Sequence, residues 1–243
     1  MDGGPGGCYR PWMSLATLSP DRDPDALRRA FARVETWVFD LDNTLYPPHE
    51  RLFDQIEAKI TAFVIRELGV DEAEAARMRR AYWHDHGTTL AGLMIHHGID
   101  PDPFLEFVHD IDFAPLQRNA RLRAAIEALP GRSIVYTNGT AHYARQVTEA
   151  IGIRDLFEAF YGVESAFYTP KPAPAAYTRI FGADGLDPKR AAMFEDDPRN
   201  LRAPCELGLE TVWVDPRAGE VEVPAPHVLH QTDDLAGFLE QLV

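Results

Sequence analysis

The sequence is poor in cysteine and lysine, and it has no long apolar run. Its two cysteines, Cys8 and Cys205, lie far apart in the chain, so a disulfide framework is not expected. No stretch approaches the roughly 18 consecutive apolar residues that a membrane span needs, and the N-terminal segment lacks a basic start followed by an apolar core. These absences predict a cytoplasmic protein without a membrane partner.

Positive charge is also scarce. The chain has 24 basic and 38 acidic residues, which gives a formal net charge of -14. Such a surface repels nucleic acid and anionic membranes, so we expect no nucleic acid polymer as a partner. A small anionic substrate is compatible with this charge only where it is compensated locally. The length of 243 residues suits one large domain, or a core with a smaller insertion, in a monomer or a homodimer.

The first half of the chain falls into three segments of different pattern. Residues 1–30 are rich in Gly, Pro and Asp and predict a poorly ordered tail, because they bury too little apolar surface to offset their ordering entropy. Residues 31–47 contain VETWVFD, which is typical of a buried strand. Residues 48–118 show apolar residues at helical spacing and no convincing strand. We therefore expect only helices in that third segment.

The second half alternates between strand and helix patterns. The expected strands are 133–138, 159–163, 191–196 and 210–215, with a last short one at 227–229. This alternation is typical of a parallel sheet with helices on both faces. The sequence thus predicts an α/β fold: a Rossmann-like catalytic core formed by residues 31–47 and 119–243, with residues 48–118 as an inserted, all-helical cap domain.

Acidic residues follow the first and fourth expected core strands. In an open parallel sheet, ligands bind beyond the carboxyl ends of the strands. Asp40 and Asp42 lie there, and taken alone they are equally well explained as turn formers. Glu195 and Asp196 end the fourth strand, and carboxylates brought this close repel one another unless a cation lies between them. Oxygen donors without His or Cys favour Mg²⁺.

Two further loops offer a hydroxyl, backbone amides and a positive charge. Thr137, Asn138 and Gly139 precede a predicted helix and form either a plain turn or a phosphate cradle. Lys171 lies between two prolines and is either a solvated charge or a compact cation for one phosphate oxygen. Because only three of the 24 basic residues are lysines, its presence there weakly favours the second interpretation.

The four loops DLDNT, TNGT, TPKP and EDDPRN, in this order, resemble the motifs of the haloacid dehalogenase superfamily of phosphohydrolases. The longer stretches DLDNTLYP, YTNGTAHYARQV, GIRDLFEAFYGVESAFYTPKPAPAAY and FEDDPRNLRAPCELGLETVWV are similar to its pyrimidine 5′-nucleotidase branch. The resemblance covers roughly residues 34 to 215. It implies that Asp40 is the nucleophile, that Asp42 is the general acid and base, and that Thr137 and Lys171 are the other catalytic residues.

The resemblance also implies a magnesium site. The expected ligands are Asp40, Asp42, Asp196 and, through a bound water, Glu195. One position departs from the superfamily pattern, since Asp197 stands where many relatives have a serine. The resemblance therefore specifies the nucleophile more closely than it specifies the metal ligands.

The expected activity is Mg²⁺-dependent hydrolysis of a small phosphorylated metabolite through an aspartyl-phosphate. Nucleoside 5′-monophosphates are the expected substrates, with pyrimidines preferred. The expected substrate-binding residues are Asn43, Tyr46, Thr137, Asn138, Gly139 and Lys171. A phosphatase of sugar or cofactor phosphates is the first alternative. A dehalogenase needs neither a metal nor an acid at Asp42, and a catalytically silent binding module would be expected to have lost a motif residue.

The histidines and aromatic residues of the helical segment are expected to be structural or solvated. Neither HDH at 84–86 nor HH at 96–97 has the i, i+4 spacing of paired metal ligands on one helix face. Tyr82 and Trp83 are expected in the core.

Overall fold

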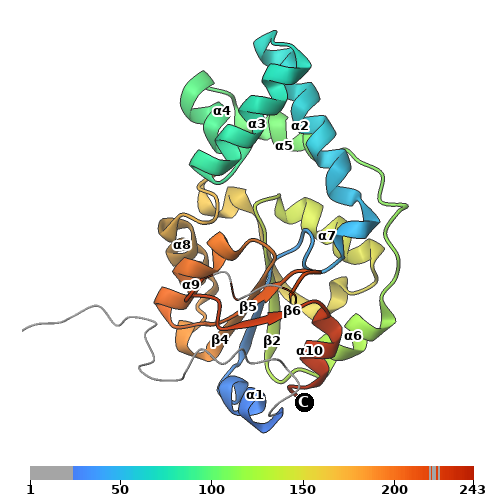
Figure 1. Ribbon diagram of the computed structural model, residues 1–243, viewed down its shortest axis with the longest axis vertical. Helices are drawn as coiled ribbons and strands as arrows, with labels where there is room; N and C mark the ends of the chain where they lie inside the picture. The colour runs from blue at the N-terminus through green and yellow to red at the C-terminus, as the bar shows by residue number, and fades with distance from the viewer. Residues whose placement is uncertain (1–23, 219, 221–222, 224) are drawn as a thin grey trace, which may run out of the picture.

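The computed structural model describes residues 24–218, 220, 223 and 225–243, and its centre is a six-stranded parallel sheet (Figure 1). The strands are β1 (Thr36–Phe39), β2 (Arg132–Tyr136), β3 (Phe157–Tyr161), β4 (Ala191–Glu195), β5 (Glu210–Val214) and β6 (His230–Thr232). Their order is β3-β2-β1-β4-β5-β6, and every neighbouring pair is parallel. The predicted Rossmann-like α/β core is confirmed.

Alternate residues of the central strands pack on opposite faces of the sheet, as the period of two in a strand requires. On one face Phe39 and Phe194 stack with ring centroids 4.8 Å apart. On the other, Val38 and Met193 lie in a second apolar cluster. The first face is covered by α6 (Ala120–Glu127), α7 (Ala141–Ala150) and α10 (Leu235–Glu240), and the second by α8 (Pro174–Asp184) and α9 (Arg202–Leu207). Because both faces are buried, the strands are almost wholly apolar.

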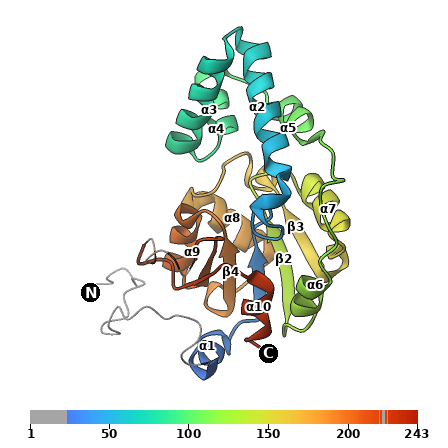
Figure 2. The same ribbon diagram turned by 45° about the vertical axis from the view of Figure 1, so that its right-hand side comes forward.

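Residues 48–118 form a helical unit with an apolar cluster of its own. Its helices are α2 (Leu52–Leu68), α3 (Glu72–His86), α4 (Thr89–His97) and α5 (Pro101–His109), and the structure shows no strand in this segment. Asp71 caps α3 by accepting the Glu74 N–H, and Gly69 ends α2 at a φ of 66°. Figures 1 and 2 show the unit at one end of the sheet. No helix in the described ranges has both the length and the apolar content to cross a bilayer.

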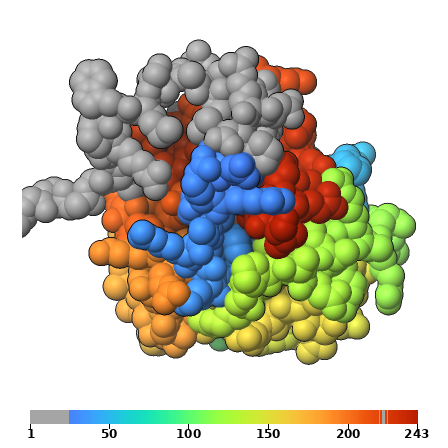
Figure 3. Space-filling model, turned by 90° about the horizontal axis from the view of Figure 1, so that it is seen from below, coloured from blue at the N-terminus to red at the C-terminus, as the bar shows by residue number. Residues whose placement is uncertain are grey.

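The expectation of a poorly ordered segment is wrong for residues 24–30. They form most of α1 (Pro24–Phe31), which packs beside the C-terminal helix α10 (Figure 3). Phe31 meets Phe238 edge to face at 5.7 Å, and Arg28 donates to the Gln241 carbonyl at 3.0 Å. These contacts supply the burial that local composition did not indicate. Residues 1–23 lie outside the described residues.

The last strand begins later than predicted. Residues 227–229 are irregular, and β6 starts at His230. The hydroxyl of Thr211 donates to the His227 carbonyl at 2.7 Å and accepts the Leu229 N–H at 3.2 Å. A side chain thus takes the place of strand pairing in this segment, which a strand pattern alone does not reveal.

Candidate active site

The acidic residues of the first and fourth motifs meet at the centre of the sheet. Asp40 follows β1, Glu195 ends β4, and these strands are neighbours. The Asp40 N–H donates to the Phe194 carbonyl at 2.9 Å, which continues the strand pairing up to the acidic side chains. In the order β3-β2-β1-β4-β5-β6 successive strands are added on one side of β1 up to β3 and on its other side from β4 onward, and ligands bind at such a switch point in open α/β sheets.

Lys171 is buried between two carboxylates. Its Nζ lies 2.6 Å from Asp40 Oδ1 and 2.6 Å from Glu195 Oε2, and its side chain is 1% exposed. Asn138 holds the lysine backbone from both sides, accepting its N–H at 2.8 Å and donating to its carbonyl at 3.2 Å. Burial lowers the pKa of Lys171, but the two carboxylates outweigh it and raise the pKa above its usual value. The alternative of a solvated charge is excluded.

Three carboxylates converge beside this lysine. Oxygens of Asp40, Glu195 and Asp196 all lie within 4.8 Å of one another. Burial and the nearby Glu195 raise the pKa of Asp40 to about 8 against the pull of Lys171, and the same two causes raise the pKa of Asp196. When all three carboxylates are ionised, they and the ammonium leave two negative charges, so a divalent cation fits, and an oxygen-only donor set fits Mg²⁺.

The effect of Mg²⁺ on thermal stability is expected to depend on pH, and this dependence tests the metal site. Because the folded-state pKa of Asp40 lies above its ordinary value of 3.8, the metal-free folded chain holds more protons than the unfolded chain between those values. This contribution to stability therefore falls as pH rises through that window. Saturating Mg²⁺ replaces the protons, so we expect it to raise Tm by about 5–10 °C at pH 8 and by less at pH 6.

The measurement is thermal unfolding in excess chelator and in Mg²⁺ at both pH values. Asp196→Asn should lose most of the Mg²⁺ effect, whereas Glu106→Gln, which changes an exposed carboxylate of α5, should keep it. An equal Mg²⁺ effect in both variants would contradict a site at the three carboxylates.

Asp42 lies in a separate environment. Its Oδ1 accepts hydrogen bonds from the hydroxyls of Tyr46 at 2.6 Å and Tyr143 at 2.7 Å, and its side chain is not part of the three-carboxylate group. Burial raises the pKa of Asp42, and the two hydroxyls oppose that rise. Tyr46, expected to line the pocket, thus contacts a motif carboxylate. Tyr143 was not predicted, because it lies 101 residues from Asp42 in sequence.

The second motif contains a tight side-chain turn. Thr137 is buried, and its Oγ1 accepts the Gly139 N–H at 2.9 Å. The turn, which is one of the two interpretations of this loop, is therefore present. The backbone N–H of Gly139 is hydrogen-bonded within that turn. Thr140 caps α7 by accepting the Tyr143 N–H at 3.0 Å. Phosphate contact by Thr137 stays a prediction.

Asn43 and Asp197 hold the rim of the site. Asn43 has a φ of 60°, which Asn tolerates better than most residues, and its amide donates to Asp196 Oδ2 at 3.3 Å. Asp197, at the position that departs from the superfamily pattern, pairs with Arg199 at 2.6 Å. Arg199 in turn lies 3.7 Å from the ring centroid of Trp83. Trp83 is 50% exposed, so its expected place in the core is wrong.

The histidines of the helical unit contact one another. The Nε2 atoms of His86 and His96 lie 2.9 Å apart, and the hydroxyl oxygen of Tyr82 lies 2.8 Å from His97 Nε2. Within the described part of the chain, the one group of three or more candidate metal ligands is Asp40, Glu195 and Asp196. The structure therefore gives no support to a histidine metal site.

Comparisons with known sequences agree with this geometry. The model of the haloacid dehalogenase-like hydrolase family matches residues 34–204, which include all six motif residues discussed above from Asp40 to Asp196. A curated protein, phosphate metabolism protein 8 of Saccharomyces cerevisiae, is 28% identical in an alignment 206 residues long that covers 77% of this chain. The aligned region spans 61% of the length of that yeast protein.

Solved structures share the fold. A HAD phosphatase from Thermococcus onnurineus has a TM-score of 0.57 at 19% identity, over 86% of this chain and 98% of that one. A 2-haloacid dehalogenase from Pseudomonas syringae pv. Tomato DC3000 has a TM-score of 0.55 at 20% identity, with the same coverage of both chains. Since a phosphatase and a dehalogenase match about equally well, these similarities show the fold alone, and the chemistry must be argued from the site.

Proposed function

Since the chain belongs to the haloacid dehalogenase-like hydrolases, we propose that it is a magnesium-dependent phosphatase that acts through an aspartyl-phosphate on Asp40. The main support is the buried arrangement in which Lys171 Nζ lies 2.6 Å from both Asp40 and Glu195, beside a third carboxylate. Mg²⁺ held by Asp40, Glu195 and Asp196 would balance the charge of these carboxylates and of the substrate phosphate.

The first half of the reaction transfers the phosphoryl group to the protein. An oxygen of Asp40 attacks phosphorus in line, the bond from phosphorus to the ester oxygen breaks, and Asp42 gives its proton to that leaving oxygen. Lys171 holds Asp40 in place and offsets its charge. The hydroxyls of Tyr46 and Tyr143 fix Asp42 Oδ1, so the second oxygen of that carboxyl carries the proton.

The second half restores the protein. A water molecule attacks phosphorus of the aspartyl-phosphate while Asp42 accepts its proton, the bond from phosphorus to Asp40 breaks, and inorganic phosphate leaves. Asp42 is then protonated again and Asp40 is a free carboxylate. The two aspartates suit different roles because only Asp40 contacts Lys171, whereas Asp42 is held by phenol hydroxyls.

The helical unit acts in this proposal as a cap that excludes water. It meets the core next to the site at several points. A side chain at Gly87 would approach the Lys171 carbonyl to 2.6 Å, which shows how closely the end of α3 lies to the third motif. Asp102 of α5 accepts the Tyr168 hydroxyl at 2.5 Å, and Trp83 stacks on Arg199. Substrate groups beyond the phosphate would therefore contact both the unit and the core.

Nucleoside 5′-monophosphates, with pyrimidines preferred, are the proposed substrates, on the resemblance of the motif stretches to that branch. A phosphatase of another small metabolite is the first alternative. A dehalogenase would need neither Asp42 as an acid nor the three-carboxylate group, and both are present. A cytoplasmic location and a monomeric or homodimeric state stay predictions from composition.

Phosphate release from a panel of substrates tests this choice. We expect UMP, CMP and their deoxy forms to have a higher kcat/KM than purine monophosphates and sugar phosphates, and we expect chelator to abolish release from all of them. A tenfold advantage corresponds to about 1.4 kcal/mol in transition-state binding. If purines or sugar phosphates win by that margin, the pyrimidine assignment fails. If 2-chloropropionate and no phosphate ester is turned over, the phosphatase assignment fails.

A further inference from the structure

A cavity of about 600 Å³ lies away from the carboxylate site, at the edge of the sheet. Its wall combines the edge strand β3, the short helix η2 (Arg154–Leu156), helices α6 and α7, and the segment that returns from the helical unit. Asp40, Glu195 and Lys171 are not among the residues that line it. The volume falls in the range of about 300–1,000 Å³ that is typical of small-molecule sites. The proposed phosphatase activity gives this cavity no role.

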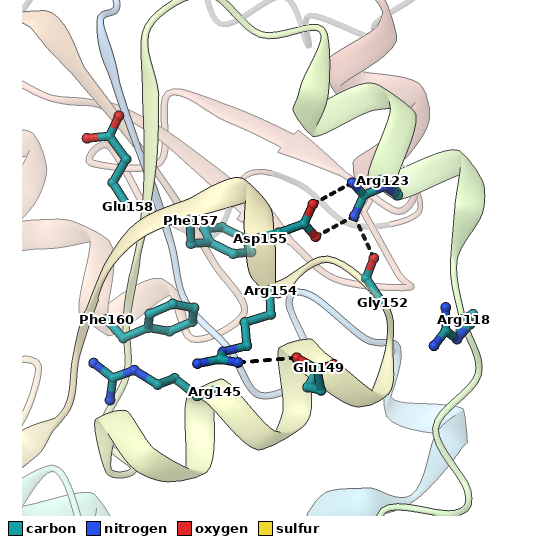
Figure 4. Close-up of a pocket in the computed structure, with 10 residues that line it drawn as sticks. All are labelled: Arg118, Arg123, Arg145, Glu149, Gly152, Arg154, Asp155, Phe157, Glu158 and Phe160. Atoms are coloured by element: carbon teal, nitrogen blue, oxygen red, sulfur yellow. Dashed lines mark hydrogen bonds and ion pairs between the residues drawn. The ribbon is translucent and has the colours of Figure 1, made fainter.

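Arginine side chains surround the cavity (Figure 4). They are Arg118, Arg123, Arg145 and Arg154. Arg123 is fully engaged, since it makes two 2.6 Å bonds to Asp155 and donates to the Gly152 carbonyl at 2.9 Å. Arg154 approaches Glu149 only to 3.4 Å, and both side chains are more than half exposed. That contact is weak, because solvent screens exposed pairs.

Arg118 and Arg145 have no carboxylate partner within the described residues. Both are exposed. Arg145 lies over the ring of Phe160 at 5.1 Å, a stacking contact that leaves the in-plane N–H groups available. The remaining acidic residue of the wall is Glu158. Its carboxylate lies 3.8 Å from the guanidinium group of Arg132, a residue that does not line the cavity. Two or three guanidinium groups are therefore available to a ligand.

This local excess of positive charge occurs in a chain with a net charge of -14. Small anions are repelled over most of such a surface and bind where the local charge is reversed. Guanidinium forks match phosphate oxygens. Phe157 and Phe160, with ring centroids 5.7 Å apart at 65°, add an apolar wall. We propose that the cavity is a second ligand site, for a small phosphorylated metabolite with an apolar or aromatic part, and that Arg145 and Arg154 bind its phosphate.

The cavity shares a helix with the carboxylate site. Arg145 and Glu149 lie on α7, and the same helix carries Tyr143, whose hydroxyl donates to Asp42 at 2.7 Å. Arg118 lies where the chain returns from the helical unit to the core. A ligand bound to Arg145 and Arg154 thus contacts α7 and the segment that follows it, and α7 is a contiguous physical route to Asp42.

Binding of inorganic pyrophosphate to the full-length protein in excess chelator tests the proposal. Chelator removes the cation through which a phosphate would bind at the three carboxylates, so binding under these conditions reports the cavity. We expect calorimetry to show salt-sensitive binding that weakens at least about tenfold in Arg145→Ala/Arg154→Ala. Arg33→Ala/Arg80→Ala removes the same charge from two other exposed arginines and should stay within about twofold of wild type, because they lie outside the cavity.

A further variant keeps the test decisive if the double variant folds poorly. Glu149→Gln removes the carboxylate that faces Arg154, so we expect it to tighten pyrophosphate binding several-fold. The proposal is overturned if the wild-type protein shows no binding in chelator, if the control arginine pair loses as much affinity as the cavity pair, or if Glu149→Gln weakens binding.

Discussion

We expect Asp40→Asn to abolish phosphatase turnover, with kcat lower by about 10⁴-fold or more, because the amide oxygen is too poor a nucleophile to form the aspartyl-phosphate. The substitution keeps the size of the side chain. It also retains an oxygen that can accept the Lys171 hydrogen bond, which is 2.6 Å long in the wild-type protein. We therefore expect substrate to bind with an affinity within about tenfold of that of wild type while chemistry fails.

Steady-state and single-turnover kinetics measure this effect. Asp197→Asn is the matched control: it changes the third acidic residue of the same motif region, which pairs with Arg199 and lies outside the carboxylate group. That variant should keep kcat within about tenfold of wild type. Comparable losses in both variants would show that the effect is a general disturbance of the site and not the loss of a nucleophile.

We expect Lys171→Met to lower both activity and stability. The lysine is 1% exposed and is bonded to Asp40 and Glu195, which are also buried. Its removal leaves two buried carboxylates without their cation, which costs about 3–5 kcal/mol. In a chain of this size that corresponds to a fall in Tm of about 10 °C. We expect kcat to fall by at least about 10³-fold, since Asp40 is no longer held and its charge is no longer offset.

Lys189→Met provides the control for this variant, because Lys189 is an exposed lysine far from the site in the same lysine-poor chain. Thermal unfolding with and without Mg²⁺ separates the causes. Mg²⁺ should restore part of the lost stability of Lys171→Met, because it supplies positive charge to the same carboxylates. If Lys171→Met were as stable as Lys189→Met, the ion pairs of Lys171 with Asp40 and Glu195 would not stabilise the fold.

The core of the fold was predictable because its signals are local. Each central strand is a short apolar run, and alternate residues such as Val38 and Phe39 pack on opposite faces. Asp40 and Glu195 were placed together by a rule that needs only strand ends, namely that ligands bind beyond the carboxyl ends of parallel strands. The burial of Lys171 agreed with the inference from lysine scarcity, although scarcity alone did not exclude a solvated charge.

The residues that sequence reasoning missed depend on contacts between distant segments. Tyr143 binds Asp42 across 101 residues, and on a helix its spacing marks it only as an apolar position. Helix α1 packs against Phe238 through Phe31, and the exposed ring of Trp83 stacks on the guanidinium group of Arg199. No local pattern encodes these partners. The backbone N–H of Asn138 was expected at phosphate, which stays a prediction, whereas the contact of its side chain with both backbone polar groups of Lys171 was not predicted.

The central claim is a covalent phosphate on Asp40, and trapping it is the most direct test. In Asp42→Asn the residue that activates the hydrolytic water is lost, so the phosphorylated protein should accumulate after mixing with Mg²⁺ and p-nitrophenyl phosphate, whose leaving oxygen needs no proton from Asp42. Acid quenching followed by peptide mass spectrometry should find one phosphoryl group on Asp40, and none in Asp40→Asn/Asp42→Asn. Full phosphate release without any phosphorylated Asp40 peptide, or a phosphate mapped to another residue, would contradict the account.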